Sequence, residues 1–438
     1  DNANYKANVE MFAKSFDGNR NKAYATWQYF GSPVKSADRN QLPLETTWVR
    51  KYDRTLNVPN SDEKWTDVDN GTLAQGQAYE ISQPKPATYR FIGELNTADF
   101  TFPVDGMASA TNYQDMNILA NPYTGAMSID KLDFSGATAA DKVVYLFNTG
   151  SRKDWIANSG PTTNGTTQGQ YTKAIPANLA GHVAGMPNQI PSLSSFMVKS
   201  TAAGNLKYRY ADLVTATEEN RAPQRHFHSL AVDVESAKTA DRLWLVQAEG
   251  TTDRYDNGWD GEKIFAPGEA ALYAMQDRSY QVTTTDAIGE TKVGFVPGDG
   301  EQNYKLTFHL DGGDGTQQYT LLDKRTGLTR AIHDGDTYEF TATKGDAAHR
   351  FTILGNGAKA TADQRGFQIS ADLRRNFTVK NFTDQPAEAL VFDAAGKIQA
   401  RFTVEPGSEN TGTVVMPGAY VVRVSNKVTT LTQRFVMP

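Results

Sequence analysis

The sequence predicts an all-β protein made of tandem antiparallel β-sandwich domains of the jelly-roll or immunoglobulin-like kind. Short segments rich in aromatic and β-branched residues alternate with a period of two, which is typical of half-buried strands. Clusters of Gly, Asn, Asp and Pro separate these segments at close intervals, as turns do. Only residues 129–134 and 178–182 have the pattern of a helical turn, so little helix is expected.

Composition limits the class of protein. A chain of 438 residues with 39% hydrophobic residues can bury the cores of two to four domains. The formal net charge of −6 argues against nucleic acid as a partner. No apolar run approaches the roughly 18 residues that a membrane-spanning helix needs. Cysteine is absent, which excludes disulfides and thiolate zinc sites and suits an exported bacterial protein.

The first residues, DNANYKANVEMF, have neither the basic start nor the apolar run of a signal peptide. We therefore expect residue 1 to follow a processing site or to lie inside a longer protein.

Residues 1–225 are expected to form an irregular β-rich domain, with a possible split near residue 105. Strands are predicted at residues 22–34 and 46–52 from their aromatic and β-branched content. This region carries four aromatic residues that are candidates for stacking on sugars, namely Trp27, Phe30, Trp48 and Trp65. Burial in the core is the favoured interpretation, because Trp and Phe mostly stabilise proteins by being buried.

Three motifs in this region occur together. They are ILANPY at residues 118–123, YLFN at residues 145–148 and PSLSSFMVK at residues 191–199, with WQYFGSPV upstream at residues 27–34. The arrangement resembles one that recurs in large secreted surface proteins of the Bacteroidetes, over most of residues 20–213.

Residues 226–354 are predicted to form a β-sandwich that begins with an antiparallel hairpin. Alternating apolar residues run from Phe227 to Val234, cross a polar turn at residues 236–239 and return from Leu243 to Val246. The loop YDNGWDGEK at residues 255–263 follows. The region resembles the module that commonly comes next in the same Bacteroidetes proteins.

Residues 355–365 are Gly- and Ala-rich without periodicity, and we interpret them as a linker. Closely spaced short strands then fill residues 366–438. VFDAAGK at residues 391–397, PGAYVVRV at residues 417–424 and the last strand resemble the small, seven-stranded, immunoglobulin-like sorting domain of type IX secretion cargo. The ending QRFVMP departs from that domain, which usually closes with a Lys and three Val or Ile residues.

Few residues form patterns that are typical of metal-binding or catalytic sites. Asp256, Asp260 and Glu262 lie within seven residues, so their oxygens could hold calcium, although Asp and Gly at this density also form tight turns. His226 and His228 would face the same side of a strand, as two metal ligands do, but no third ligand can be assigned. No nucleophile elbow, zinc-protease motif, phosphate loop or dinucleotide fingerprint is present. A glycosidase carboxylate pair stays open, because its spacing exists only in three dimensions.

These observations predict a non-catalytic protein without a cofactor, located outside the cell or on the bacterial cell surface. We interpret the chain as the C-terminal part of an adhesin or surface-layer subunit. Its expected partners are an extracellular protein or glycan, other copies of itself, and the export machinery through its C-terminal domain. The alternatives are a glycan-binding module and the non-catalytic tail of a secreted hydrolase.

Overall fold

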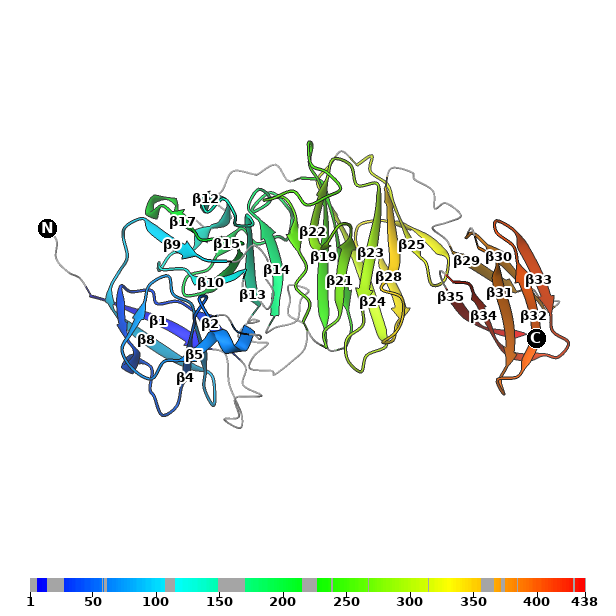
Figure 1. Ribbon diagram of the computed structural model, residues 1–438, viewed down its shortest axis with the longest axis horizontal. Coiled ribbons are helices and arrows are strands. Elements are labelled where there is room, and N and C mark those ends of the chain that lie inside the picture. Colours follow the sequence, from blue (N-terminus) through cyan, green and yellow to red (C-terminus); the bar gives the residue numbers. More distant parts are fainter. Residues whose placement is uncertain are drawn as a thin grey trace. The chain divides into compact units, whose positions relative to one another are not determined.

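The structure is a computed structural model (Figure 1). It describes residues 6–13, 27–56, 58, 61–106, 115–148, 170–214, 227–237, 239–266, 268–313, 315–355, 366–371, 375–383, 385–427 and 430–437. Two compact units can be distinguished. Unit 1 comprises residues 1–286, 297–312 and 337–343, and unit 2 comprises residues 287–296, 313–336 and 344–438.

The regular structure is nearly all strand, so the predicted all-β class with antiparallel sandwiches is confirmed. In the described ranges, helix is limited to short 3-10 turns: η2 (Arg39–Gln41), η3 (Ser61–Lys64), η4 (Ile129–Lys131) and η5 (Tyr210–Asp212). The first expected helical turn corresponds to η4. The second is a hydrogen-bonded turn after Pro176, without a helix.

The first part of unit 1 has three small sheets. Their strands are β1 (Lys6–Ala13) with β8 (Ala87–Glu94), β3 (Ser36–Asp38) with β6 (Thr72–Ala74), and β2 (Gln28–Phe30), β7 (Tyr79–Ser82), β4 (Trp48–Tyr52) and β5 (Trp65–Asp67) in that order. Alternation explains which face is buried, because Tyr89 and Phe91 of β8 lie in the core while Arg90 between them is exposed.

The next strands of unit 1 surround a second core. They are β10 (Met116–Ala120), β16 (Ser195–Lys199), β13 (Val143–Asn148) and β14 (Gln170–Pro176) in one sheet, β12 (Asp133–Gly136), β17 (Gly204–Tyr208) and β9 (Phe100–Val104) in another, and the pair β11 (Met127–Ser128) and β15 (Gln189–Ile190).

Asn121 explains why two of the sequence motifs occur together. Its side-chain oxygen accepts a hydrogen bond from the Tyr123 backbone at 2.9 Å, and its buried amide nitrogen lies 3.1 Å from the Ile190 oxygen and 3.0 Å from the Pro191 oxygen. The N-P-Y segment is thereby tied to the start of the PSLSSFMVK segment. A buried amide that satisfies several backbone groups at once is difficult to replace.

The predicted hairpin is present in unit 1 as β18 (Ser229–Glu235) and β19 (Ala240–Gln247), with Ser236 bonded to Thr239 across the turn. Further strands extend its sheet on both sides: β24 (Asn303–Asp311) and β27 (Thr337–Thr341) beyond β18, and β22 (Ser279–Thr285), with β21 (Ala271–Met275) and β20 (Gly261–Glu262), beyond β19. The β19–β22 pair is parallel, which the predicted antiparallel pattern did not include.

One core in unit 1 joins this sheet to the preceding strands. Trp244, Val246 and Val282 belong to the same buried cluster as Phe102 and Phe196. That core contains residues from both sides of the domain boundary predicted near residue 225, so separating the chain there would expose it.

Four strands of unit 2 are paired in the order β26 (Leu328–Ile332), β25 (Tyr319–Asp323), β28 (His349–Gly355) and β23 (Glu290–Val296). Seven more strands form a small sandwich, as expected from the sequence (Figure 1). One layer is β29 (Phe367–Ala371), β30 (Asn376–Asn381) and β33 (Glu409–Thr413), and the other is β32 (Ile398–Val404), β31 (Ala387–Asp393), β34 (Gly418–Ser425) and β35 (Thr430–Met437).

The predicted linker at residues 355–365 lies outside the described residues, apart from residue 355 at the end of β28. The proposed domain boundaries therefore stay predictions. Among the described residues there is no helix long and apolar enough to cross a membrane.

Candidate functional site

Two of the three candidate calcium-binding carboxylates accept hydrogen bonds that hold their own loop in place. Asp256 accepts hydrogen bonds from the backbone nitrogen and the hydroxyl of Thr252, at 2.6 and 3.0 Å. Asp260 is fully buried and accepts from the backbone nitrogens of Asp256, at 2.7 Å, and Thr284, at 2.6 Å. Burial raises the pKa of Asp260 to about 7, although both backbone hydrogen bonds oppose that shift. These contacts close the loop against β22.

The third carboxylate, Glu262, contacts cations instead. One of its oxygens pairs with Lys199, and the other lies 2.9 Å from an Arg278 nitrogen. Lys199 also lies 3.5 Å from Asp115, so the ion pairs connect the residue before β10 with β16 and β20. Burial alone would raise the pKa of Glu262, but Lys199 and Arg278 hold it below its usual value.

No group of three or more histidine or acidic side chains that could hold a metal ion occurs in the described ranges. Asp256, Asp260 and Glu262 each have protein partners, which favours the turn-forming interpretation. Calcium binding by these residues stays a prediction. His226 lies outside the described residues, and His228 has its Nδ1 3.3 Å from the Gly312 backbone oxygen.

A buried ion pair involves Lys263, the last residue of the YDNGWDGEK loop, and the sequence analysis did not predict it. Lys263 Nζ is 2.6 Å from each carboxylate oxygen of Asp241 in β19, and the two side chains are only 5% and 3% exposed. Asp241 also accepts a hydrogen bond from the Leu272 backbone at 2.7 Å. The ion pair and this hydrogen bond link three segments of unit 1, so their role is to stabilise the fold.

The four candidate aromatic residues divide into two kinds. Phe30 and Trp65 are buried in cores, so the interpretation as core anchors is confirmed for both. Trp27 and Trp48 are only half-buried. Their rings stack with centroids 6.3 Å apart and planes at 25°, and the Arg50 guanidinium lies 4.3 Å from the centre of the Trp27 ring.

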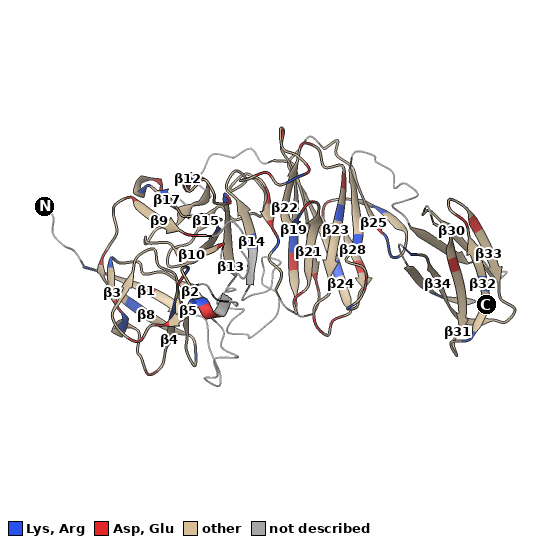
Figure 2. Ribbon diagram, in the orientation of Figure 1, with Lys and Arg blue, Asp and Glu red and all other residues tan. Residues whose placement is uncertain are grey.

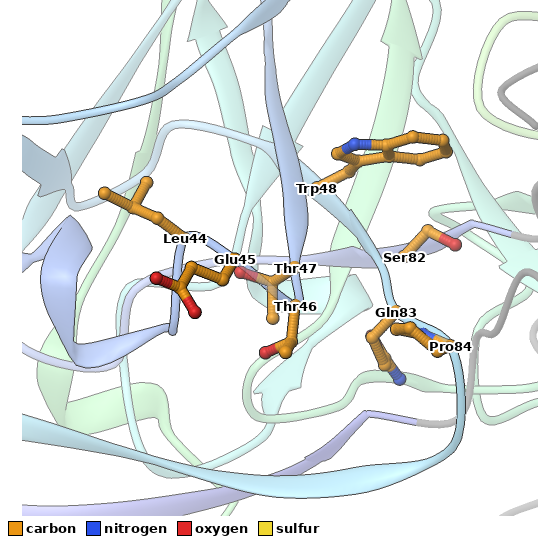
Figure 3. Close-up of a pocket in the computed structure, with 8 residues that line it drawn as sticks. All are labelled: Leu44, Glu45, Thr46, Thr47, Trp48, Ser82, Gln83 and Pro84. Atoms are coloured by element: carbon orange, nitrogen blue, oxygen red, sulfur yellow. The ribbon is translucent and has the colours of Figure 1, made fainter. Parts of the chain in front are cut away.

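A small pocket of about 50 Å³ lies beside Trp48, where the β4–β7 ladder ends. Figure 3 shows its lining, which consists of Leu44, Glu45, Thr46, Thr47, Trp48, Ser82, Gln83 and Pro84. The buried residues Thr47, Ser82 and Gln83 form its floor, and exposed residues form its rim. Trp48 is the one aromatic residue in the lining.

Two polar atoms of these lining residues, Ser82 Oγ and Gln83 Oε1, are shielded from solvent and have no hydrogen-bond partner among the described residues. Thr47 differs, because its hydroxyl donates to the Pro43 oxygen at 2.7 Å. Nothing in the local sequence around Ser82 and Gln83 distinguishes them from ordinary strand residues, so sequence analysis could not select them.

The chain has matches among known proteins. Residues 8–354 match a family described as "Domain of unknown function (DUF8693)". The chain is 30% identical, over 461 aligned residues, to "Minor fimbrium subunit Mfa5" of Porphyromonas gingivalis. That match covers 100% of this chain and 37% of the relative, so the chain spans little more than a third of the relative's length.

A solved structure described as "Biofilm associated protein - BSP domain" aligns with 94% of this chain and 90% of its own, at 9% sequence identity. Its TM-score of 0.15 does not establish a shared fold.

Proposed function

The chain belongs to the DUF8693 family through residues 8–354, and we propose that it is the C-terminal part of an exported cell-surface protein with a structural or adhesive role. The observation that carries the proposal is the match, along the whole chain, to a protein named as a minor fimbrium subunit. The relative comes from Porphyromonas gingivalis, which agrees with the resemblance to surface proteins of the Bacteroidetes.

The distribution of charge supports a role in protein or glycan contacts. Figure 2 shows acidic and basic residues interspersed along the described strands, and the net charge of the whole sequence is −6. Binding to a nucleic-acid backbone requires clustered Lys and Arg residues. An adhesive or assembling role needs no such cluster of charge, and layered sheets can position surface loops that make contacts.

We propose further that these residues have no catalytic activity. The sequence lacks the common nucleophile and metal motifs, and the described loop carboxylates Asp256, Asp260 and Glu262 are bonded to backbone groups or cations. A screen of the purified chain against polysaccharides and peptides tests this. Turnover that disappears when a single Asp or Glu is replaced would identify an enzyme instead.

Surface location is tested on cells of the source organism with an antibody against the chain. Immunogold labelling of intact cells and recovery of the protein in sheared surface fibres are expected. Electron microscopy of the purified chain would reveal self-assembly as ordered filaments or arrays. A protein found only inside intact cells would contradict the proposal.

Export through the C-terminal sandwich is the finer part of the proposal. Its support is the seven-stranded arrangement of residues 367–437 together with the sequence resemblance. Deleting residues 366–438 should leave the protein in the periplasm, whereas the full chain reaches the surface. Equal surface labelling of both would show that export uses another signal.

The second candidate function is a glycan-binding module, which the half-buried Trp48 and its pocket favour. For the tail of a secreted hydrolase, the discriminating observation is a catalytic motif upstream of residue 1.

A further inference from the structure

Four large apolar side chains of the C-terminal sandwich face solvent. They are Ile398, Val415, Met416 and Val436, with exposed fractions of 43%, 83%, 67% and 78%. Apolar side chains scattered singly over a surface need no explanation, whereas several of them gathered in one place mark a contact site. The strand registers decide which of these cases applies.

The registers bring the four side chains to one end of the sandwich. β34 begins where β35 ends, because Ala419 pairs with Val436. β32 begins at the same end, because Ile398 pairs with the end of β31, which lies beside the start of β34. The short connection from β33 to β34 carries Val415 and Met416. We call these four residues the apolar tip.

The chain enters the sandwich at the opposite end. Phe367 begins β29 and pairs with Asn381 at the end of β30, whereas β30 begins beside the end of β33. Gly327, in the turn between β25 and β26, lies against this entry, since a Cβ on it would be 2.6 Å from the Phe367 backbone oxygen. This contact of the sandwich with the rest of unit 2 therefore lies away from the apolar tip.

The backbone of the tip is held in place although its side chains are exposed. An Arg375 guanidinium nitrogen donates to the Val415 oxygen at 2.8 Å, and the Tyr420 hydroxyl donates to the Met416 oxygen at 2.6 Å. Val414 and Tyr420 are each 4% exposed and belong to the core of the sandwich. A backbone fixed in this way has little freedom left to lose on binding, which favours affinity.

Positive charge accompanies the tip. Lys397 and Arg434 lie next to tip residues in the sequence and are exposed, and Arg375 contacts the tip backbone. Asp393 lies at the same end, but its carboxylate accepts hydrogen bonds inside its own turn, from the backbone nitrogens of Ala395 and Lys397, both at 2.9 Å.

The C-terminal sandwich also differs in net charge from the rest of the chain. Residues 366–438 carry eight Lys or Arg residues and six Asp or Glu residues, a formal charge of +2, although the whole sequence carries −6. A surface that is both apolar and positive is attracted to an anionic partner that also offers an apolar phase.

A lipid bilayer with anionic headgroups has both properties. Its phosphates attract Lys and Arg side chains, and apolar side chains enter the boundary between headgroups and acyl chains. The tip projects from a connection and from strand ends, and a projecting group enters a soft interface without needing a matching pocket. A rigid protein partner would have to supply such a pocket.

We propose that the apolar tip binds the surface of an anionic lipid bilayer. Val415, Met416 and Val436 enter the interface, and the cations beside them lie at the level of the lipid phosphates. The inference goes beyond the proposed surface role, because a protein on the cell surface needs no direct contact with lipid.

Cosedimentation of the purified 438-residue chain with vesicles tests the inference. One set of vesicles is phosphatidylcholine, and the other contains equal parts of phosphatidylcholine and phosphatidylglycerol. The chain should pellet with the anionic vesicles and several-fold less with the neutral ones, and added salt should weaken binding because it screens exposed charges. No pelleting with anionic vesicles up to about 5 mM lipid, or equal pelleting with both kinds, would overturn the inference.

Variants locate the contact. Val415→Ser combined with Met416→Ser should lower vesicle binding about tenfold or more, because the apolar area that enters the interface is lost. Arg434→Glu should lower it several-fold. The matched controls are Leu328→Ser, at a 46% exposed residue of β26, and Lys85→Glu, at an exposed residue of unit 1, and both should bind normally. Unchanged binding by both tip variants would place the contact elsewhere and refute the inference.

The absence of cysteine from the chain allows a direct measurement at the tip. Met416→Cys supplies a single thiol for an environment-sensitive fluorophore, and Leu328→Cys supplies the control. The emission of the label at position 416 should shift to the blue with anionic vesicles, and that of the label at position 328 should not. A response of the control label alone would contradict the proposed orientation.

Sedimentation velocity without lipid tests a second copy of the chain as the occupant. Any self-association should be the same in the unmodified chain and in the Val415→Ser, Met416→Ser variant. Self-association that this variant loses would show that another copy covers the tip, and the inference would then be wrong. A chain that ignores vesicles but is recovered in surface fibres would refute this inference and leave the proposed surface role intact.

Discussion

Replacing Lys263 by Met should destabilise unit 1 by about 3–5 kcal/mol, the usual cost of leaving one partner of a buried ion pair alone. The ammonium of Lys263 lies 2.6 Å from both oxygens of Asp241, and the two side chains are 5% and 3% exposed. Without it, the buried carboxylate retains the Leu272 backbone N–H as its remaining described donor. The double variant Lys263→Met with Asp241→Asn removes both charges and should recover most of the loss, because no bare charge is then buried.

Urea unfolding followed by tryptophan fluorescence measures these differences, from the midpoint and slope of the transition. The matched control is Lys35→Met, which breaks an ion pair with Glu94 whose side chains are 44% and 45% exposed. An exposed pair contributes about 0–1 kcal/mol. If Lys263→Met cost no more than Lys35→Met, the argument from burial would be refuted, because some other group would have to neutralise Asp241.

There are four further predictions, two on pH, one on calcium and one on proteolysis. Asp260 has its folded-state pKa raised to about 7, so its contribution to stability is complete below the unfolded pKa of 3.8 and is lost as the pH rises through 7. Urea unfolding should therefore show Asp260→Asn gaining stability relative to the unmodified chain between pH 5 and pH 8, and a constant difference would contradict the shift. His349 has its pKa lowered to about 4, first by burial and then by neighbouring lysines, so its contribution is present above pH 6.5 and is lost as the pH falls toward 4. His349→Gln should accordingly gain relative stability between pH 7 and pH 5, and no gain would mean that the imidazole charges freely. If Asp256, Asp260 and Glu262 bind calcium, a chelator should lower the melting temperature and added calcium should restore it; their existing partners lead us to expect no change. Limited proteolysis should cut first within residues 355–366 and release a stable C-terminal fragment, identified by mass spectrometry, since that segment carries almost no large apolar side chains. First cuts inside residues 367–437 would show the boundary to be wrong.

The all-β class and several of its elements were determined by the sequence alone, because alternation and turn residues act over short distances. Phe227 to Val246 predicted the β18–β19 hairpin, in which paired residues lie between 5 positions (Glu235 and Ala240) and 17 positions (Ser229 and Val246) apart along the chain. The seven C-terminal strands were readable for the same reason, since each is bounded by its own turn residues.

Only the tertiary structure decided which residues of the same type are buried in a core and which lie at the surface, where they can contact a partner. Trp48 and Trp65 have the same chemistry, but Trp65 lies in a core while Trp48 is half-buried beside Ser82, 34 positions along the chain. Sequence proximity also grouped Glu262 with Asp256, whereas the fold pairs Glu262 with Lys199, 63 positions away. Strand register and packing bring distant residues together, and no local pattern encodes either, so the chemistry of this site was decided by contacts that the sequence does not display.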